Sequence, residues 1–207
     1  PRGWARTFPN LMTQEAVRGA EQYWDPEFSA HAHTLHTIYV FTRNVVGSMD
    51  YTPVILGLAP EAEMHQTSNA HELATAVAFE SGIQHFADSV SAYRCQPDYV
   101  QSYLKAVPAA WDETRYLSGT PGDYVLLARR SGNCWFISCL NGQEKARSIP
   151  GWFAFLGAGE FSGEFIVDGK TQRKTDQRQF RLTSRDTIDL EMRGRGGFCG
   201  RIKPAAH

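Results

Sequence analysis

The sequence lacks the features that mark several classes of protein. Its 207 residues include only four cysteines and no CxxC pair, which excludes a zinc ribbon and a thioredoxin-like redox motif. Cys134 and Cys139 stand five apart in one predicted strand, on opposite faces, so we expect free thiols. No apolar run approaches the roughly 18 residues of a membrane-spanning helix. There is no Gly-x-Ser-x-Gly, P-loop or HExxH motif either.

The charge balance excludes a strongly basic or acidic protein. With 21 basic and 22 acidic residues the net charge is -1, and Lys and Arg form no long run, so nucleic acid is not an expected partner. The hydrophobic content of 42% is enough to form a core. The sequence begins at Pro1 rather than Met, so we expect a piece of a longer protein whose location the first residues do not reveal.

The first half of the sequence mixes helix and strand signals. The apolar stretch at residues 8–12 is expected to end a strand. The β-branched stretch at residues 37–49 predicts a buried strand with some helical character. Asn69 followed by Glu72 resembles a capping box and predicts a helix over residues 70–80.

The second half changes character after a further predicted helix at residues 98–105. Strand and turn signals dominate from there, so we place a domain boundary between residues 106 and 121. The Asn141-Gly142 pair is a strong hairpin signal. Six strands, which predict an antiparallel sheet or a small sandwich, are expected at residues 124–129, 134–140, 160–167, 179–182, 187–192 and 198–202.

Two acidic residues, Glu15 and Glu21, stand six apart in the stretch NLMTQEAVRGAE. Six residues of regular helix turn through about 600°, which would separate the two side chains. A loop at a strand end, with Gly19 at the turn, is the better setting. A carboxylic acid there could protonate a glycosidic oxygen, and converging carboxylates could hold Ca²⁺. The alternative is a solvated pair of surface glutamates on either side of Arg18.

Histidines gather at His31, His33 and His36 in the stretch HAHTLH. On a strand, a His-x-His pair lies on one side and can bind Zn²⁺. A hydrogen bond to a sugar hydroxyl and a histidine satisfied within the fold are the other interpretations. Arg43, in FTRN, could contact a polar ligand or form a structural ion pair with Asp50.

Five blocks of the sequence resemble, in order, blocks of glycoside hydrolase family 97. They are RTFPNLMTQEAVRGAE, FTRNVVGSMDYTP, AFESGIQHFADS, VPAAWDETRYLSGTPGDYVLLARRSGNCWFI and GGFCGRI. Together they extend from about Arg6 to Ile202. Each block is short, but five in the same order are highly specific, so the resemblance covers nearly the whole chain.

The resemblance implies both a fold and an activity. Family members are bacterial enzymes with a central (β/α)8 barrel and a C-terminal β domain, and they hydrolyse α-glucosidic or α-galactosidic bonds of oligosaccharides with bound Ca²⁺. Residues 1–108 would be the C-terminal portion of the barrel, residues 109–203 the antiparallel β domain and residues 204–207 a frayed tail. The expected fold class is therefore α/β plus all-β, and the expected location is the periplasm or outside the cell.

The resemblance also implies roles for individual residues. By position in the motifs, Glu21 resembles the general acid, which in inverting members also approaches the metal, and Glu15 resembles a Ca²⁺-binding glutamate. His36 resembles the first residue of a His-Thr pair near the site, so His36 and Arg43 are the expected substrate-binding residues. The catalytic partner would lie upstream of Pro1, whether it is a glutamate base in inverting members or an aspartate nucleophile in retaining ones.

A different class of function is the alternative. A non-catalytic carbohydrate-binding or structural fragment could present Trp135 and Trp152 as an aromatic platform, and finding both buried would count against that. The glycosidase hypothesis predicts a chain that is inactive alone, because an acid without its base or nucleophile loses most of the rate enhancement. It also predicts self-association, because half a barrel leaves open strand edges.

Overall fold

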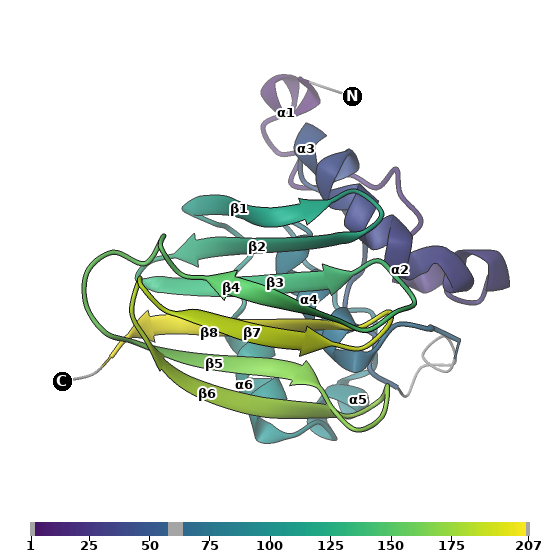
Figure 1. Cartoon of the computed structure of the whole chain (residues 1–207). Coiled ribbons are helices and arrows are strands. Elements are labelled where there is room, and N and C mark those ends of the chain that lie inside the picture. Colours follow the sequence, from purple (N-terminus) through teal and green to yellow (C-terminus); the bar gives the residue numbers. More distant parts are fainter. Residues whose placement is uncertain (1–2, 58–63, 206–207) are drawn as a thin grey trace.

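The computed structural model describes residues 3–57 and 64–205. Helices occupy the first half of the chain and strands the second (Figure 1). The helices, together with one 3-10 turn, are α1 (Trp4–Thr7), η1 (Ala20–Gln22), α2 (Pro26–Phe41), α3 (Arg43–Val46), α4 (Asn69–Ala78), α5 (Val90–Arg94) and α6 (Asp98–Ala106).

Six of the strands in the described residues form one sheet, in which every pairing is antiparallel. In spatial order they are β1 (Glu113–Thr120), β2 (Tyr124–Ser131), β3 (Cys134–Asn141), β8 (Gly197–Pro204), β5 (Phe161–Asp168) and β6 (Thr175–Leu182). The strands β4 (Arg147–Trp152) and β7 (Thr187–Met192) pair separately as an antiparallel ribbon. The ribbon and α4 lie on opposite faces of the sheet (Figure 1).

The ribbon side of the sheet packs as an apolar core. Trp135, Ile137 and Cys139 alternate along β3 toward this side, where Ile149 of β4 and Leu190 of β7 meet them. This alternation is what the period of two along a strand requires. Together with β4 and β7, the sheet forms the small sandwich that the strand pattern predicted.

The other side of the sheet packs against α4. Phe136 and Leu140 of β3 join Leu73 and Val77 of α4 in a second core. Cys134 belongs to this core and Cys139 to the ribbon core, and all four cysteines are free thiols. The prediction that these two cysteines lie on opposite faces of one strand is therefore confirmed.

Polar side chains of the sheet hold the α4 backbone. Ser138 Oγ donates to Ala74 O at 2.8 Å. The buried guanidinium of Arg129 donates to Val77 O at 2.8 Å and to Ala78 O at 3.1 Å. Since the last carbonyls of a helix have no partner within the helix, Arg129 satisfies two acceptors that would otherwise be buried alone.

The start of α4 corrects the predicted capping box. Ser68 rather than Asn69 is the N-cap, and its Oγ accepts from His71 N at 3.1 Å, an interaction that stabilises a helix by about 1 kcal/mol. The Glu72 side chain does not return to the cap but makes buried hydrogen bonds to other segments.

The strand predicted at residues 37–49 is wrong, because α2 and α3 occupy most of it. Asp25 begins α2 by accepting from Glu27 N at 2.9 Å, and Pro26 takes the first helical position; both are helix-start signals. The β-branched residues that suggested a strand lower helix propensity by less than about 1 kcal/mol each. Packing of α2 against the sheet outweighs that preference.

The strand expected to end at residues 8–12 is also absent, since these residues are irregular. The isolated bridge in the described residues joins Gln14 to Met49 and is parallel. A barrel would use this type of pairing, but one bridge does not make a barrel. The six-stranded sheet and its ribbon confirm the antiparallel β domain of the predicted fold class. The barrel portion over residues 1–108 stays a prediction.

All six predicted strands exist, but β1 and β4 were missed and the Asn141-Gly142 hairpin is wrong. The strand after this pair, β4, pairs with β7 and not with β3. Asn141 itself continues the β3–β8 pairing, since its N donates to Gly196 O at 2.9 Å, and its side chain donates to Arg193 O at 2.8 Å. At the expected frayed tail, Ala205 N donates to Glu160 O at 2.9 Å. Residues 206–207 of that tail lie outside the described residues.

Candidate functional site

Glu21 lies in η1, and its carboxylate is exposed. Its Oε2 accepts from Thr52 Oγ1 at 2.6 Å, and the preceding Ala20 N donates to Tyr51 O at 3.0 Å. A β carbon on Gly19 would lie 2.3 Å from Glu21 Oε2 and 2.5 Å from Tyr51 O. Glycine is therefore required where the two segments meet.

Backbone strain is concentrated around the two glutamates. Ala16, next to Glu15, has φ 80°, while Thr52 and Val54, in the segment that contacts Glu21, have φ 53° and 72°. Positive φ is a genuine outlier for β-branched residues and costs about 1–3 kcal/mol each. Strain of this kind gathers at functional sites, where the surrounding structure holds it in place. It identifies the segments that carry Glu15, Glu21 and Thr52 as the candidate site.

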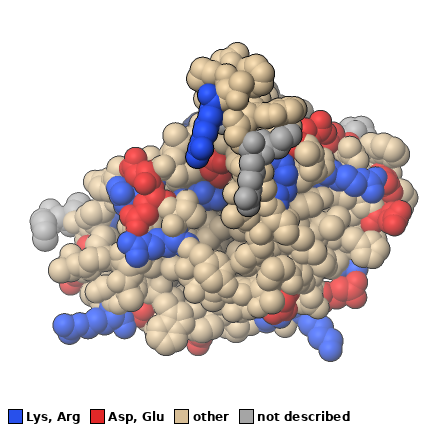
Figure 2. Space-filling model, turned by 90° about the horizontal axis from the view of Figure 1, so that it is seen from above, with Lys and Arg blue, Asp and Glu red and all other residues tan. Residues whose placement is uncertain are grey.

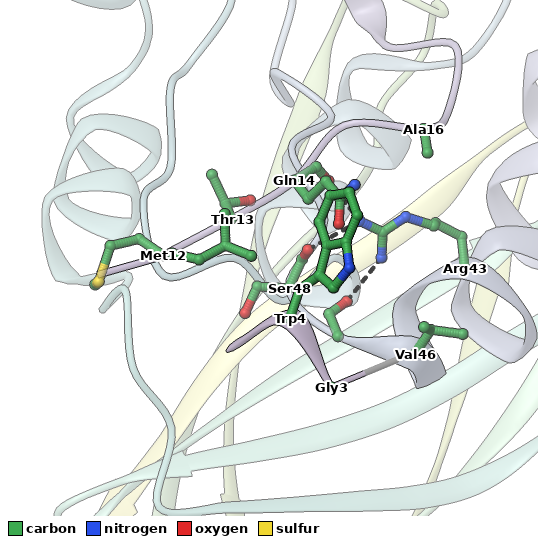
Figure 3. A pocket seen from close by; sticks show the side chains of 11 residues that line it. Gly3, Trp4, Met12, Thr13, Gln14, Ala16, Arg43, Val46 and Ser48 are labelled. Atoms are coloured by element: carbon green, nitrogen blue, oxygen red, sulfur yellow. Dashed lines mark hydrogen bonds between the residues drawn. The ribbon is translucent and has the colours of Figure 1, made fainter. Parts of the chain in front are cut away.

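Arg43, predicted to bind substrate, is engaged by backbone carbonyls (Figure 3). It donates to Glu15 O at 3.0 and 2.9 Å, to Gly47 O at 3.0 Å, to Ser48 O at 3.1 Å and to Gln14 O. These bonds join the segment that carries Glu15 to the end of α3, beside a hollow of about 190 Å³. Arg43 thus holds the candidate site in shape, and its contact with substrate stays a prediction.

Glu15 and Glu21 do not form a metal site by themselves. No group of three or more His, Cys, Asp or Glu side chains able to hold a metal converges within residues 3–57 and 64–205. Ca²⁺ takes about six to eight oxygen ligands, and these two exposed carboxylates supply only part of that number. Their chemistry suits calcium, but the ligand set that the chain offers does not complete a site.

The histidine motif lies on α2, so the interpretation as a zinc-binding pair on a strand is wrong. His31 is exposed, whereas His33 and His36 are buried. His36 Nδ1 lies 2.9 Å from His71 Nε2, and its Nε2 is bonded to Tyr51 OH. Burial lowers the pKa of His36 well below its usual value. His36 is thus a histidine satisfied within the fold, and its contact with substrate stays a prediction.

Sequence reasoning missed the role of Glu72, which it assigned to a helix cap. Glu72 is fully buried, and its Oε1 accepts from Tyr23 OH at 2.7 Å and from Thr67 Oγ1 at 2.5 Å. Burial raises the pKa of this carboxyl and so favours its neutral form. An available signal was its position in HELATAVA, where a carboxylate stands within an otherwise largely apolar helix.

The two tryptophans do not form a common platform. Trp135 is 7% exposed and packs against Phe155, with ring centroids 4.8 Å apart, whereas Trp152 is 62% exposed. Burial of Trp135 counts against a two-ring surface for sugars.

The described surface shows no large area of one charge on the face seen in Figure 2, where acidic and basic side chains are interspersed around a broad uncharged area. This mixture does not resemble the basic patch that nucleic-acid binding needs. Within the described residues, no helix is both long and apolar enough to cross a bilayer.

A family model matches the strand-rich half of the chain. It is described as glycosyl-hydrolase 97 C-terminal, oligomerisation, and it matches residues 110–203. This range begins just before β1 and ends within β8.

Two longer proteins are similar over nearly all of the chain. A protein named probable retaining alpha-galactosidase, from Streptomyces bingchenggensis, is 37% identical over 199 residues, which are 96% of this chain and 29% of that protein. A retaining alpha-galactosidase from Bacteroides thetaiotaomicron is 28% identical over 98% of this chain and 32% of its own length. The chain therefore spans about a third of the length of these relatives.

A solved structure is similar over the same extent. It is a variant of a glycoside hydrolase family 97 enzyme from Pseudoalteromonas sp. strain K8, in complex with panose, with a TM-score of 0.83 and 29% sequence identity. The similarity covers 99% of this chain and 33% of that one. It therefore includes the helices and the segments around Glu15 and Glu21, beyond the range that the family model matches.

Proposed function

The chain belongs to glycoside hydrolase family 97 and corresponds to about a third of its longer relatives, and from this premise we propose that it is part of an enzyme that cleaves α-galactosidic or α-glucosidic bonds of oligosaccharides. The names of the two relatives support the glycoside hydrolase class and make α-galactosides the first substrates to test.

Glu21 is the general acid in this proposal. The supporting observation is the hydrogen bond that its exposed carboxyl accepts from Thr52, on a segment with left-handed backbone at Thr52. The one hydroxyl proton of Thr52 has two acceptors at 2.6 Å, Glu21 Oε2 and Tyr51 O. When it is donated to Oε2, Oε1 is left to carry the proton of the acid. Oε1 then gives this proton to the glycosidic oxygen as the bond to the sugar breaks.

In this proposal the base or nucleophile that completes the reaction lies in the complete enzyme, upstream of Pro1. Glu15 and Glu21 would supply oxygen ligands to Ca²⁺, and the remaining ligands would come from outside the described residues. A periplasmic or extracellular location goes with this proposal.

An assay of the 207-residue chain on aryl α-galactoside and α-glucoside, with Ca²⁺ and then with chelator, tests whether the chain is active alone. We expect no release of sugar. Calcium-dependent release would contradict the proposal that the partner group lies elsewhere.

Glu21→Gln in the complete enzyme tests the acid. Activity on substrates with poor leaving groups should fall by roughly 10²- to 10⁴-fold, the usual contribution of a general acid. Activated aryl glycosides should lose much less, because their leaving groups need little protonation. Glu27→Gln, at an exposed site at the start of α2, is the matched control and should leave both activities unchanged. Equal loss on both substrate types would argue against the acid role.

Self-association is also proposed. The description of the domain at residues 110–203 as an oligomerisation domain supports it in general, and the finer proposal is that an open barrel edge in residues 1–108 takes part. Light scattering over a range of concentrations tests both. A mass that stays that of one chain at all concentrations would contradict them.

Carbohydrate binding without catalysis is the second candidate, because Trp152 is exposed on β4. Titration of the chain with galacto-oligosaccharides, with and without Trp152→Ala, separates it from the first. Binding that Trp152→Ala removes and Glu21→Gln leaves intact would favour the binding module.

A further inference from the structure

A directed chain of hydrogen bonds, here called the first arm, runs from the β domain to Tyr51. Burial holds the pKa of His71 down to about 3 and lowers that of His36, so both rings are neutral at pH 7. The carbonyl of Gly196 can only accept, so His71 Nδ1, 2.9 Å away, carries the proton. His71 Nε2 therefore accepts, and His36 Nδ1 donates to it across 2.9 Å. His36 Nε2 accepts in turn, from the Tyr51 hydroxyl.

A second arm runs from Arg173 to Tyr23. The Arg173 side chain has only donors, and its Nη1 lies 2.7 Å from His65 Nε2, the nearer ring nitrogen. Nη1 also lies 2.9 Å from His65 Nδ1, but Nδ1 has a second neighbour, Thr67 Oγ1 at 3.0 Å, which can accept because its own proton goes to Glu72. We therefore assign the proton to His65 Nδ1, which donates to Thr67 Oγ1. Thr67 donates onward to Glu72 Oε1, which also accepts from Tyr23 OH.

The two arms end on the tyrosines that flank the Glu21 turn. Tyr23 follows Glu21 by two residues, while Tyr51 precedes Thr52 and accepts the backbone hydrogen bond from Ala20. Both tyrosines are fully buried, and their hydroxyl oxygens lie 3.5 Å apart. Any rotation of Tyr51 would leave His36 Nε2 buried without a donor, so the arms favour one arrangement of this turn.

The far end of each arm belongs to the β domain. Gly196 lies in the loop before β8, and Arg173 lies in the loop between β5 and β6. Both loops fall within residues 110–203. The same loops hydrogen-bond to the N-terminus of α4, where Asn69 N donates to Gln172 O at 2.9 Å and Ser68 N donates to Arg195 O at 3.1 Å.

We propose that the β domain positions Glu21 through these two hydrogen-bonded arms, with Tyr51 and Tyr23 as positioning residues. The proposal rests on Glu21 being the acid of the proposed function. It gives the C-terminal domain a role in the reaction that is separate from assembly.

The tautomers of the buried histidines test the geometry without any substrate. With ¹⁵N-labelled histidine in the 207-residue chain at pH 7, we expect His36, His65 and His71 each to be protonated at Nδ1 and unprotonated at Nε2. A proton on Nε2 of His36 or His71 would reverse the first arm and overturn the proposal.

Hydrogen exchange tests whether the first arm holds the Glu21 turn. In Tyr51→Phe the Ala20 amide should exchange at least about tenfold faster, while the amide of Ile137 in β3 keeps its rate. Tyr103→Phe is the matched control, because Tyr103 is equally buried but takes no part in either arm, and it should leave the Ala20 amide unchanged. Equal acceleration of Ala20 and Ile137 would mean general loosening and would overturn the proposal.

A change made inside the β domain tests the second arm. Arg173→Met removes the donor to His65, and the amide of Gln22, in the Glu21 turn, should exchange several-fold faster. Arg178→Met removes an exposed arginine of β6 and is the control. Identical exchange of the Gln22 amide in the two variants would contradict the coupling.

Activity in the complete enzyme separates this proposal from the proposed function. Tyr51→Phe should lower kcat about tenfold or more on substrates with poor leaving groups, with KM unchanged, and much less on activated aryl glycosides. If Glu21→Gln gives no such selectivity, the acid assignment fails whatever the tyrosine does. If Glu21→Gln behaves as expected but Tyr51→Phe equals wild type on both substrates, the positioning role alone is overturned.

Discussion

The two faces of the six-stranded sheet are held together in different ways. On the ribbon side, the ring of Phe165 covers two glycines: a β carbon on Gly163 or on Gly200 would lie 2.8 or 2.9 Å from it. On the helix side, Arg129 and Ser138 donate hydrogen bonds to the backbone of α4. The ribbon side is held by close apolar packing, whereas the helix side is held by apolar packing and by directional hydrogen bonds.

This difference separates stability from function. Apolar packing is non-directional and tolerates rearrangement of similar volumes. Buried hydrogen bonds require one partner in one place, since an unsatisfied group costs about 1–3 kcal/mol. The helix side continues through α4 into the hydrogen-bonded arms and reaches the Glu21 turn, whereas the ribbon side ends at an exposed surface. We therefore expect substitutions on the ribbon side to change stability, and those on the helix side to change stability and site geometry together.

The largest expected effect is on the ribbon side. Phe165→Ala removes a fully buried ring that packs against Phe180 and Phe198, and it should lower the free energy of unfolding by about 3–5 kcal/mol. Urea unfolding measures the loss. The same loss is expected at pH 7.5 and at pH 5.5, because no titrating group is involved. Phe180→Ala, at a half-buried position, should cost less, and an equal loss would contradict this account of packing.

The next largest loss of stability is expected on the helix side, where Arg129 donates to the last carbonyls of α4. Arg129→Met keeps the length of the side chain but leaves Val77 O and Ala78 O buried without donors, which should cost roughly 2–4 kcal/mol. Burial lowers the pKa of Arg129 only to about 10, so it stays charged at neutral pH. Arg130→Met is the control, because the half-exposed Arg130 pairs with Asp112 and Glu113. It should cost about 1 kcal/mol or less, and equal losses would show that burial of Arg129 is not decisive.

The same contrast explains how much of the fold followed from sequence. Six of the eight strands in the described residues were predictable, because alternating apolar residues and turn signals are local. The strand predicted at residues 37–49 failed because Asp25 and Pro26 had already begun a helix, whose packing then favoured Thr37 in helical form. β4 was missed because it contains Pro150 and Gly151, which are poor strand residues tolerated in an edge ribbon.

The candidate site was predictable only in part. The motifs identified Glu15 and Glu21, and Gly19 was expected at a turn. Left-handed φ at Thr52 and Val54 leaves no local signal, since β-branched residues normally avoid it. The pairing of His36 with His71 joins helices 35 residues apart in the chain, so only the tertiary fold reveals it.

Acid should weaken the helix side selectively. The pKa of His71 is about 3 in the folded protein against 6.5 for the free side chain, so below pH 6.5 the unfolded chain takes up a proton that the folded chain refuses. The contribution of neutral His71 to the free energy of unfolding is therefore complete above pH 6.5. It is lost as the pH falls, by about 2 kcal/mol at pH 5. His36 and His65 act in the same direction, whereas Glu72, with its raised pKa, opposes them.

The measurement is the free energy of unfolding between pH 7.5 and pH 5, with Phe165→Ala as the reference. Wild type and Phe165→Ala should lose the same free energy of unfolding on acidification, because the substitution removes no titrating group. Stability that stays flat to pH 5 would contradict the neutral, buried histidines on which the helix side depends.

The smallest effect is expected at the outer surface of the ribbon. Trp152 is 62% exposed on β4, opposite Thr187 of β7, so Trp152→Ser should change the free energy of unfolding by less than about 0.5 kcal/mol. Trp135→Ser, at a 7% exposed position on β3, is the matched comparison and should cost about 3–5 kcal/mol. A loss above about 2 kcal/mol for Trp152→Ser would mean that a partner chain covers this tryptophan in solution. Since such a loss would depend on protein concentration, repeating the unfolding at a tenfold lower concentration would distinguish a partner chain from packing within one chain.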